Sequence, residues 1–381
     1  LRRAGGGLLA GLLATVTLCA ADIAVTDLFR VRTFAEEVYT QAAFGSLLAG
    51  VAGDGAWGDQ RDLVVGTVIH FLLGAATLLL AAPLVPRPGD GDPDAGWRLS
   101  RRSSPRLNAL LAAAGWLITL AAIALPIAGL AWKAGLATQR TAEGASVQWS
   151  ARKAIQMTAR APLEHGREIL WSLAVAATAA SAVLIVASIA SVWGRTRRWP
   201  AFAAGVVAAA ALAIPGPLVG VGVIALLAHG DDSMWWWLTP LYDKTILAPG
   251  LAQFVRALPL AGLVIWNQVA SVPRDLLEAA ASEGSGPVGR WLWVGFPLRA
   301  PGLAAGWLCA FALAVGEVSA TLLVYPPGTT PLSVRISQLL HYGVDDRVAA
   351  LSLAVLLAVL ALGLSANWLV TNRRRRDVAK S

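Results

Sequence analysis

The stretch Leu277–Pro297, LEAAASEGSGPVGRWLWVGFP, decides how the rest of the chain is organised. Its first part, 276–283, is rich in alanine and glutamate, which favour helix, so we expect about two helical turns there. Gly284 is typical of a helix end, and Pro287 does not continue a helix. Long apolar segments lie on both sides of the stretch. We therefore expect a short helix across the mouth of a membrane bundle.

The composition indicates a polytopic membrane protein. The chain has 381 residues, of which 56% are hydrophobic and only 14% charged. Its formal net charge is +8, but the basic residues form short clusters between apolar runs, so they indicate membrane topology rather than nucleic-acid binding. Cys19 and Cys309 both lie inside apolar runs and predict no disulfide framework.

Apolar runs of about 20 residues, the length that crosses a bilayer as a helix, recur along the chain. Eight runs reach or approach this length: Leu8–Leu28, Leu63–Val85, Leu107–Trp132, Ile169–Trp193, Ala201–Ala228, Ile246–Val269, Pro301–Val324 and Val348–Val370. The predicted fold class is therefore all-α, a polytopic helical membrane bundle of about eight transmembrane helices.

The positions of basic residues predict the orientation. Arg373–Arg376 directly follow the last apolar run and place the C-terminus in the cytoplasm. Three other segments then fall on the cytoplasmic side: 273–297, Arg87–Arg106 and Arg195–Arg198. The acidic, Trp-rich loop His229–Lys244 falls outside, as does the long segment Lys133–Glu168, which carries basic residues against the rule.

The stretch 273–297 resembles the EAA loop of the permeases of binding-protein-dependent ABC importers, the MetI-like family. The matching positions are Glu278, Ala279, Ala280, Gly284, Val294, Phe296 and Pro297. The family usually has isoleucine and leucine where this chain has Val294 and Phe296. The resemblance implies a type I importer permease fold. It also implies a coupling helix that docks into an ATP-hydrolysing partner, through Glu278, Ala279, Ala280, Gly284 and Pro297. The alternative is an amphipathic turn that only joins two spans.

Two segments of the chain are related by an internal repeat. Ala21–Thr26 parallels Gly316–Thr321, and Thr33–Gln41 parallels Thr330–Gln338, each pair following an apolar run. Together with the EAA loop, this predicts that the chain is part of a fused double permease. Its expected parts are a remnant of the first half at 1–86 with two spans, a linker at 87–106, a second half of six spans at 107–371 and a basic tail at 372–381. The alternative is that alanine- and leucine-rich spans align with one another by composition.

Three charged residues stand in or near the apolar runs. Asp22 and Glu317 are related by the repeat, and ionisable groups at such depth are costly and suggest function. They are candidates for a gate or for contact with a cationic solute; the structural alternatives are snorkelling or a hydrogen bond to a helix end. Arg256 either pairs with Glu317 or snorkels outward.

Pro215 and Pro217 interrupt the run Ala201–Ala228. Such a break can shape a cavity or hinge in the translocation path, or it can be a tolerated kink. The four histidines are scattered without a zinc-binding spacing, so no metal site is predicted.

The run Ala320–Gly328, ATLLVYPPG, followed by TPLSVR at Thr330–Arg335, is similar to the ferric-iron branch of these importers, whose permeases are fused doubles. Tyr325 departs from that pattern, where a basic residue is more familiar. Thiamine importers have the same build, so both solutes are candidates. Pro326, Pro327 and Gly328 predict a stiff outer turn, either a contact for a substrate-binding protein or a simple connection.

The chain contains no GxxxxGK[ST] phosphate loop. We therefore expect no cofactor in this chain and no enzymatic activity, with ATP and Mg²⁺ bound by a dimer of partner ATPase subunits. The other expected partners are a substrate-binding protein and the lipid bilayer of a bacterial inner membrane, but no nucleic acid. The competing classes are an ATP-independent secondary transporter, which does not explain the EAA loop, and a membrane enzyme, for which no nucleophile–base pair is found.

Overall fold

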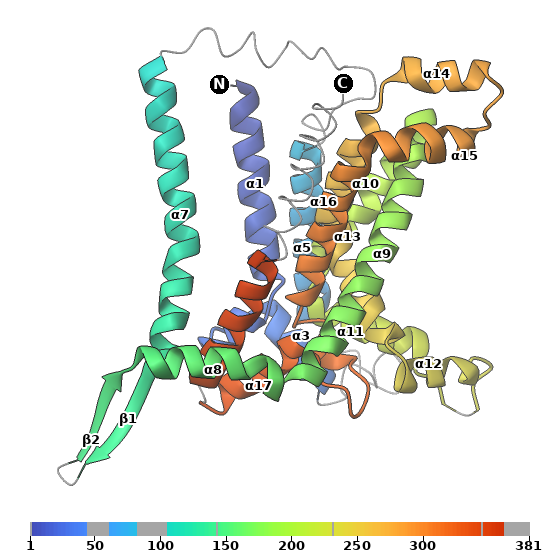
Figure 1. Ribbon diagram of the computed structural model, residues 1–381. Helices are drawn as coiled ribbons and strands as arrows, with labels where there is room; N and C mark the ends of the chain where they lie inside the picture. Colours follow the sequence, from blue (N-terminus) through green and yellow to red (C-terminus); the bar gives the residue numbers. More distant parts are fainter. Residues whose placement is uncertain are drawn as a thin grey trace. The chain divides into compact units, whose positions relative to one another are not determined.

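The computed structural model describes residues 2–43, 61–81, 105–141, 144–230, 232–343 and 346–361. The chain divides into two compact units, Leu1–Asp92 with Leu170–Val334 and Pro93–Ile169 with Arg335–Ser381. Figure 1 shows that α-helices make up nearly all the described residues of both units, which confirms the all-α class.

Three long helices form the core of the first unit: α9 (Gly166–Thr196), α13 (Leu247–Ala270) and α16 (Phe296–Val315). Their shared core consists of Ala180, Val183, Ala187, Ala257, Ala261, Ile265, Val269, Leu303 and Ala310. Alanine and glycine allow close helix approach: a Cβ on Gly306 would lie 2.6 Å from the Ile265 side chain. Small residues therefore set the spacing of this core.

The N-terminal segment packs into the same unit. It contains α1 (Arg2–Ala20), α2 (Ala24–Leu28), α3 (Phe34–Ala43) and α5 (Arg61–Ala81). Helix α5 packs against both α1 and α10 (Arg198–Ala213). At this contact a Cβ on Gly74 would lie 2.6 Å from the Ala213 side chain, so a glycine again permits the approach.

The predicted span Ala201–Ala228 is sharply broken at its prolines, so the alternative of a tolerated kink is wrong. Helix α10 ends at Ala213, α11 (Gly216–Leu227) begins after Pro215, and the two helices are bent by 109°. Pro215 removes a backbone donor and adopts an extended conformation with ψ of 146°. A bend of this size is a broken span or a re-entrant segment, not a tolerated kink.

Two other predicted spans end earlier than expected. Leu8–Leu28 stops as a helix at Ala20, and Pro301–Val324 stops at Val315. The loop after each helix holds only a short helical piece, α2 or the 3₁₀ turn η5 (Thr321–Leu323). Helices α3 and α17 (Leu332–His341), each of 10 residues, then follow at equivalent places in the repeat. The two repeat segments thus have the same order of elements.

The segment around the EAA motif is mostly helical. Helix α14 (Arg274–Ser282) runs across the direction of α13 and α16, as Figure 1 shows. Helix α15 (Pro287–Arg290), a π-helical turn at Trp291–Gly295 and α16 then form one helix of 29 residues, Pro287–Val315. The predicted loop therefore ends at Gly286. Val294, Phe296 and Pro297 lie inside the next helix.

At the other end of α13 lies the Trp-rich loop, with a 3₁₀ turn η3 (Trp236–Leu238) followed by α12 (Thr239–Lys244). Met234, Trp235, Trp236 and Trp237 are all exposed there. Indole rings favour the interface between water and hydrocarbon, so these side chains suit a position at the membrane boundary.

The second unit begins with α7 (Pro105–Gly135), followed by a hairpin of β1 (Leu136–Thr141) and β2 (Gly144–Trp149). The strands are antiparallel with Leu136 opposite Trp149. Helix α8 (Ala151–Glu164) follows and runs across the end of α7 in Figure 1. The sequence predicted only a long loop at Lys133–Glu168, so both the hairpin and α8 are findings of the structure.

Four described helices have the length and composition to cross a membrane, or five if the bent pair α10–α11 forms one span. The four are Asn108–Gly135, Gly166–Thr196, Leu247–Ala270 and Pro287–Val315. Helix α5 covers part of the predicted span Leu63–Val85, and residues 346–361 are helical at the start of Val348–Val370. The remainders of these two runs, the linker 87–106 (all but its last two residues) and the tail 372–381 lie outside the described residues.

Candidate functional site

The two repeat-related acids occupy equivalent positions after α1 and α16. Asp22 Oδ1 accepts a hydrogen bond from Ala24 N at 3.2 Å, and Glu317 Oε1 accepts one from Ala320 N at 2.8 Å. Each carboxylate thus satisfies a backbone donor at the start of the short helical piece in its own loop. The hydrogen bond to a helix end, one of the alternatives for these acids, is therefore present at both.

Arg256 forms an ion pair with Glu317 rather than pointing outward. Arg256 Nε lies 3.3 Å from Glu317 Oε2, and the two side chains are only 10% and 12% exposed. Arg256 Nη1 also donates to the carbonyl of Ile214 at 3.2 Å, directly before Pro215. The same guanidinium thus neutralises Glu317 and satisfies a carbonyl freed by the break in the α10–α11 pair.

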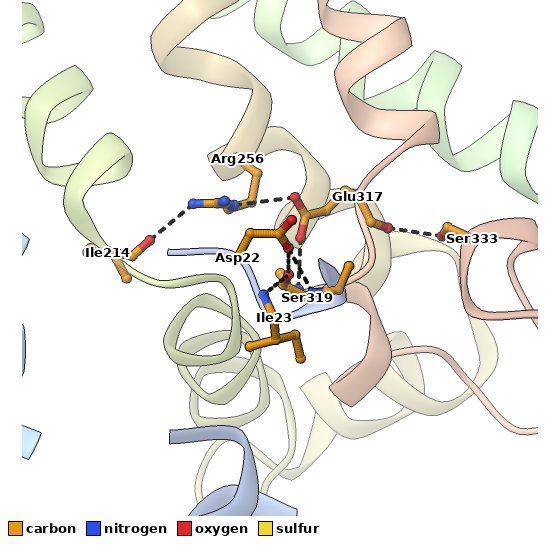
Figure 2. A network of polar contacts seen from close by, with 9 residues as sticks. Asp22, Ile23, Ile214, Arg256, Glu317, Ser319 and Ser333 are labelled. Atoms are coloured by element: carbon orange, nitrogen blue, oxygen red, sulfur yellow. Dashed lines mark hydrogen bonds and ion pairs between the residues drawn. The ribbon is translucent and has the colours of Figure 1, made fainter. Parts of the chain in front are cut away.

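Ser319 joins the two repeat segments. Its hydroxyl donates to Asp22 Oδ1 and accepts from Ile23 N at 3.2 Å (Figure 2). Close by, Gly216 N at the start of α11 donates to the Ala21 carbonyl at 3.2 Å. The loop after α1, the loop after α16 and the start of α11 therefore meet at one buried point, which we call the junction.

Two buried polar atoms near the junction have no hydrogen-bond partner among the described residues: Gln253 Oε1 and Thr321 Oγ1. Gln253 is 2% exposed and lies one helical turn before Arg256, while Thr321 is fully buried two residues after Ser319. Buried polar groups are nearly always bonded in folded proteins.

The predicted coupling residues are mostly exposed, three of them on α14, one just after it and one in α16. Glu278, Ala279, Gly284 and Pro297 are exposed, and Ala280 is half-buried. Gly284 has a φ of +87°, with Gly284 N donating to Ala281 O and Ser285 N donating to Ala280 O, both at 3.0 Å. These two bonds form a Schellman motif, in which the left-handed position favours glycine. Gly284 thus ends α14 as the sequence predicts.

The turn Pro326–Gly328 is only partly accessible. Pro326 is buried, whereas Pro327 and Gly328 are exposed, and Gly328 has a φ of +79°. Only the last two of these three residues are therefore available to a partner protein. Pro215 and Pro217, the other predicted path residues, are buried around the start of α11.

An apolar groove of about 610 Å³ lies between α9 and the α12–α13 segment. Its polar lining side chains, Thr178 and Thr245, donate their hydroxyls to the carbonyls of Val175 and Leu241. No charged side chain lines it. The groove therefore offers little to a charged solute, and the junction is the better candidate for the path. Within the described residues, no group of three or more His, Cys, Asp or Glu residues could hold a metal ion.

A comparison of the sequence with protein families finds one match, over residues 184–376, to the binding-protein-dependent transport system inner membrane component. This region covers half of the chain and contains α11, α13, the EAA helix α14 and the Glu317 loop. The chain belongs to this family. It is a multi-pass inner-membrane permease of an ABC importer for a small solute, and a transport component rather than an enzyme. Membership favours the importer over the ATP-independent transporter.

Curated relatives of the permease differ in their named solutes. The putrescine transport system permease protein PotI of Escherichia coli is 28% identical over 217 residues, which cover 55% of this chain and 75% of that protein. A protein of Salmonella choleraesuis named for 2-aminoethylphosphonate transport is 29% identical, over 41% of this chain and 58% of its own length. A molybdenum ABC transporter permease protein of Haloferax volcanii is 32% identical, over 39% of this chain and 54% of its own length. None of these names refers to iron.

Three of the residues predicted for a translocation path, Asp22, Glu317 and Arg256, lie in one network of polar contacts in the structure. Pro215, another predicted path residue, lies beside this network. The structure places Glu278, Ala279 and Ala280 on a different element, α14, whereas Pro297 lies in α16. Sequence reasoning missed Ser319 and the role of the Ile214 carbonyl. Ser319 lies in the repeat motif Gly316–Thr321, but the aligned position there is Ala24, so the repeat carried no signal for it.

Proposed function

We propose that this permease imports its solute with energy from a separate ATPase dimer, which binds α14. The observation that supports this is an exposed, properly terminated short helix that carries Glu278, Ala279 and Ala280 and is joined by short connections to α13 and to the continuous helix Pro287–Val315. A helix placed in this way transmits a push from a partner to the helices that it joins. The C-terminus, which follows the last span, is then cytoplasmic, and a substrate-binding protein delivers the solute from the other side.

We further propose that the junction is a gate. It is the place where the two repeat segments meet, and it holds a buried ion pair with unbonded polar atoms near it. Opening a path there requires the bond between Ser319 and Asp22 to break. The released carboxylate can then face a passing solute, while Arg256 stays with Glu317.

We propose ferric iron as the first candidate solute and thiamine as the second, because the run Ala320–Arg335 resembles the ferric-iron permeases. In the structure, however, Ala320, Thr321 and Val324 of this run are buried, so their residue types also serve packing. The relatives are named for an amine, a phosphonate and a metal, so uptake assays must include all these classes.

The decisive test is purification of the full-length membrane protein in mild detergent, with its ATPase identified by mass spectrometry. We expect a P-loop ATPase to co-purify with the wild type, and Glu278→Ala to lower its yield. Asp275→Ala changes another exposed carboxylate of α14 outside the motif and is the matched control. A wild-type preparation that transports solute in vesicles without any ATPase would reject the proposal.

A further inference from the structure

Two arginines meet at the elbow between α13 and α14, residues 269–273. Arg195, in the last turn of α9, donates through Nη2 to the Val272 carbonyl at 2.8 Å and through Nη1 to the Val269 carbonyl. Arg299, in α16, donates through Nη2 to the Ser271 carbonyl. Three acceptors at and just beyond the end of α13, the carbonyls of Val269, Ser271 and Val272, are thus held by side chains from two other helices.

These contacts have a clear physical reason. The last carbonyls of a helix have no partner within the helix and carry partial negative charge. Cationic donors suit them, and a guanidinium can reach two acceptors at once. Arg299 lies inside the continuous helix Pro287–Val315, and its guanidinium reaches across to the Ser271 carbonyl just beyond the end of α13.

Helices α9, α13 and α16 are also closely packed near the elbow. A Cβ on Gly194 would lie 2.4 Å from the Trp266 ring, and a Cβ on Gly302 would lie 2.0 Å from Gln268 Oε1. Val269 and Val272 are 0% and 2% exposed. Close packing and charged hydrogen bonds therefore bind α9, α13 and α16 into one body just before α14 begins.

We propose that Arg195 and Arg299 are positioning residues that transmit movement of α14 to the three core helices. This inference rests on the proposed ATPase coupling at α14 and deepens it. Without the arginines, the elbow becomes a hinge. A push on α14 then bends residues 271–273 instead of moving α9 and α16, so ATP is hydrolysed without transport.

The test compares Arg195→Ala and Arg299→Ala with Arg197→Ala, an exposed arginine two residues beyond Arg195. Each purified complex is reconstituted in vesicles, and ATP hydrolysed per solute taken up is measured together with ATPase retention. For Arg195→Ala and Arg299→Ala we expect the ATPase to be retained as in the wild type. The ATP hydrolysed per solute taken up should rise roughly tenfold, the factor that corresponds to loss of one hydrogen bond from a charged donor. Arg195→Lys, with a single donor nitrogen, should fall between.

A normal ratio of ATP to solute in both alanine variants would overturn the proposal. Loss of the ATPase from these complexes would also overturn it, because the arginines would then support docking rather than transmission. Hydrogen exchange of the permease alone provides an independent measurement: the amides of Ser271 and Val272 should exchange roughly tenfold faster in Arg195→Ala than in Arg197→Ala. Unchanged exchange would refute the role of the two arginines at the elbow, even if no ATPase binds the wild type. Absence of the ATPase alone would refute only the proposed ATPase coupling.

Discussion

Two ion pairs, one in each unit, differ in how deeply they are buried. In the first unit, Arg256 and Glu317 are 10% and 12% exposed. In the second, Lys153 Nζ and Asp346 Oδ2 are 2.8 Å apart, with side chains 27% and 35% exposed. Lys153 also donates to the Leu136 carbonyl at the start of β1.

The distance between the charges does not decide what the loss of one partner costs; the burial of the pair does. A partly exposed pair is screened by water and contributes about 0–1 kcal/mol. A buried pair costs several kcal/mol in desolvation, so removal of one partner leaves a charge that nothing compensates. The buried pair therefore constrains its surroundings strongly, while the exposed pair only helps to hold α8 near the helix that starts at Asp346.

The largest effect is expected for Arg256→Ala. The change leaves Glu317 buried without its cation and the Ile214 carbonyl without its donor. We expect a loss of about 3–5 kcal/mol in stability, seen as a much lower unfolding temperature in detergent. Arg290→Ala, at an arginine whose side chain donates to the nearby Ser285 carbonyl, is the control and should change little. Equal unfolding temperatures for the two variants would show that the pair does not carry this energy.

A smaller effect is expected for Ser319→Ala. The hydroxyl accepts from Ile23 N and donates to Asp22, so its loss leaves a buried backbone donor unsatisfied. We expect about 1–3 kcal/mol of destabilisation, together with altered transport because the two repeat segments separate more easily. Ser319→Cys restores a weak donor of similar size and should recover part of the loss. Transport and stability that both match the wild type would remove Ser319 from the gate.

The partly exposed pair of Lys153 and Asp346 should make the stability of the protein depend on pH. Burial raises the pKa of Asp346, but the hydrogen bond and charge of Lys153 and the backbone amides of Arg347 and Asp346 outweigh it, so the net pKa is lowered. A lowered pKa in the folded state stabilises the protein above the ordinary aspartate pKa, and this stability is lost as pH falls through the folded value. Unfolding temperatures from pH 7 to pH 3 should therefore fall more in the wild type than in Asp346→Asn, by the equivalent of about 0.5–1 kcal/mol. Parallel curves would contradict the prediction.

The smallest net change in stability is expected when both members of the buried pair are replaced. Arg256→Met with Glu317→Met removes both charges and keeps the volume, so the gain of about 1–4 kcal/mol from replacing a buried ion pair is offset by the Ile214 carbonyl and the Ala320 amide, which lose their partners. We expect a folded permease with nearly unchanged unfolding but little transport, because the ion pair beside the Ser319–Asp22 contact is gone. Normal transport in this variant would make the pair purely structural.

The sequence predicted the parts of this molecule that depend on local patterns. Apolar runs located the long helices, and the pattern of alanine, glutamate and Gly284 located α14 and its end within two residues. The presence of charged residues in or near apolar runs identified Asp22, Glu317 and Arg256 as candidates for a functional site from the sequence alone. These signals work because burial of charge and the conformation of glycine follow from single residues.

The remaining features depend on contacts between distant segments. Pro215 predicts a break, but the 109° bend is stabilised by Arg256 on one side and by Ala21 on the other. Arg195 indicates only membrane topology in the sequence, since its acceptors are backbone carbonyls that have no residue signature. The early ends of the spans after α1 and α16 likewise depend on how the two loops meet at Ser319.

The broken span also affects the order in which the chain can enter a membrane. Helix α11 has 12 residues, so it is about 18 Å long and too short for the roughly 30 Å of hydrocarbon. Its first amide, Gly216 N, finds its acceptor at Ala21, which the ribosome makes far earlier. When the α10–α11 segment is inserted, its acceptor at Ala21 has therefore already been made. The N-terminal helices can thus lower the cost of inserting a segment that is too short to span the bilayer alone.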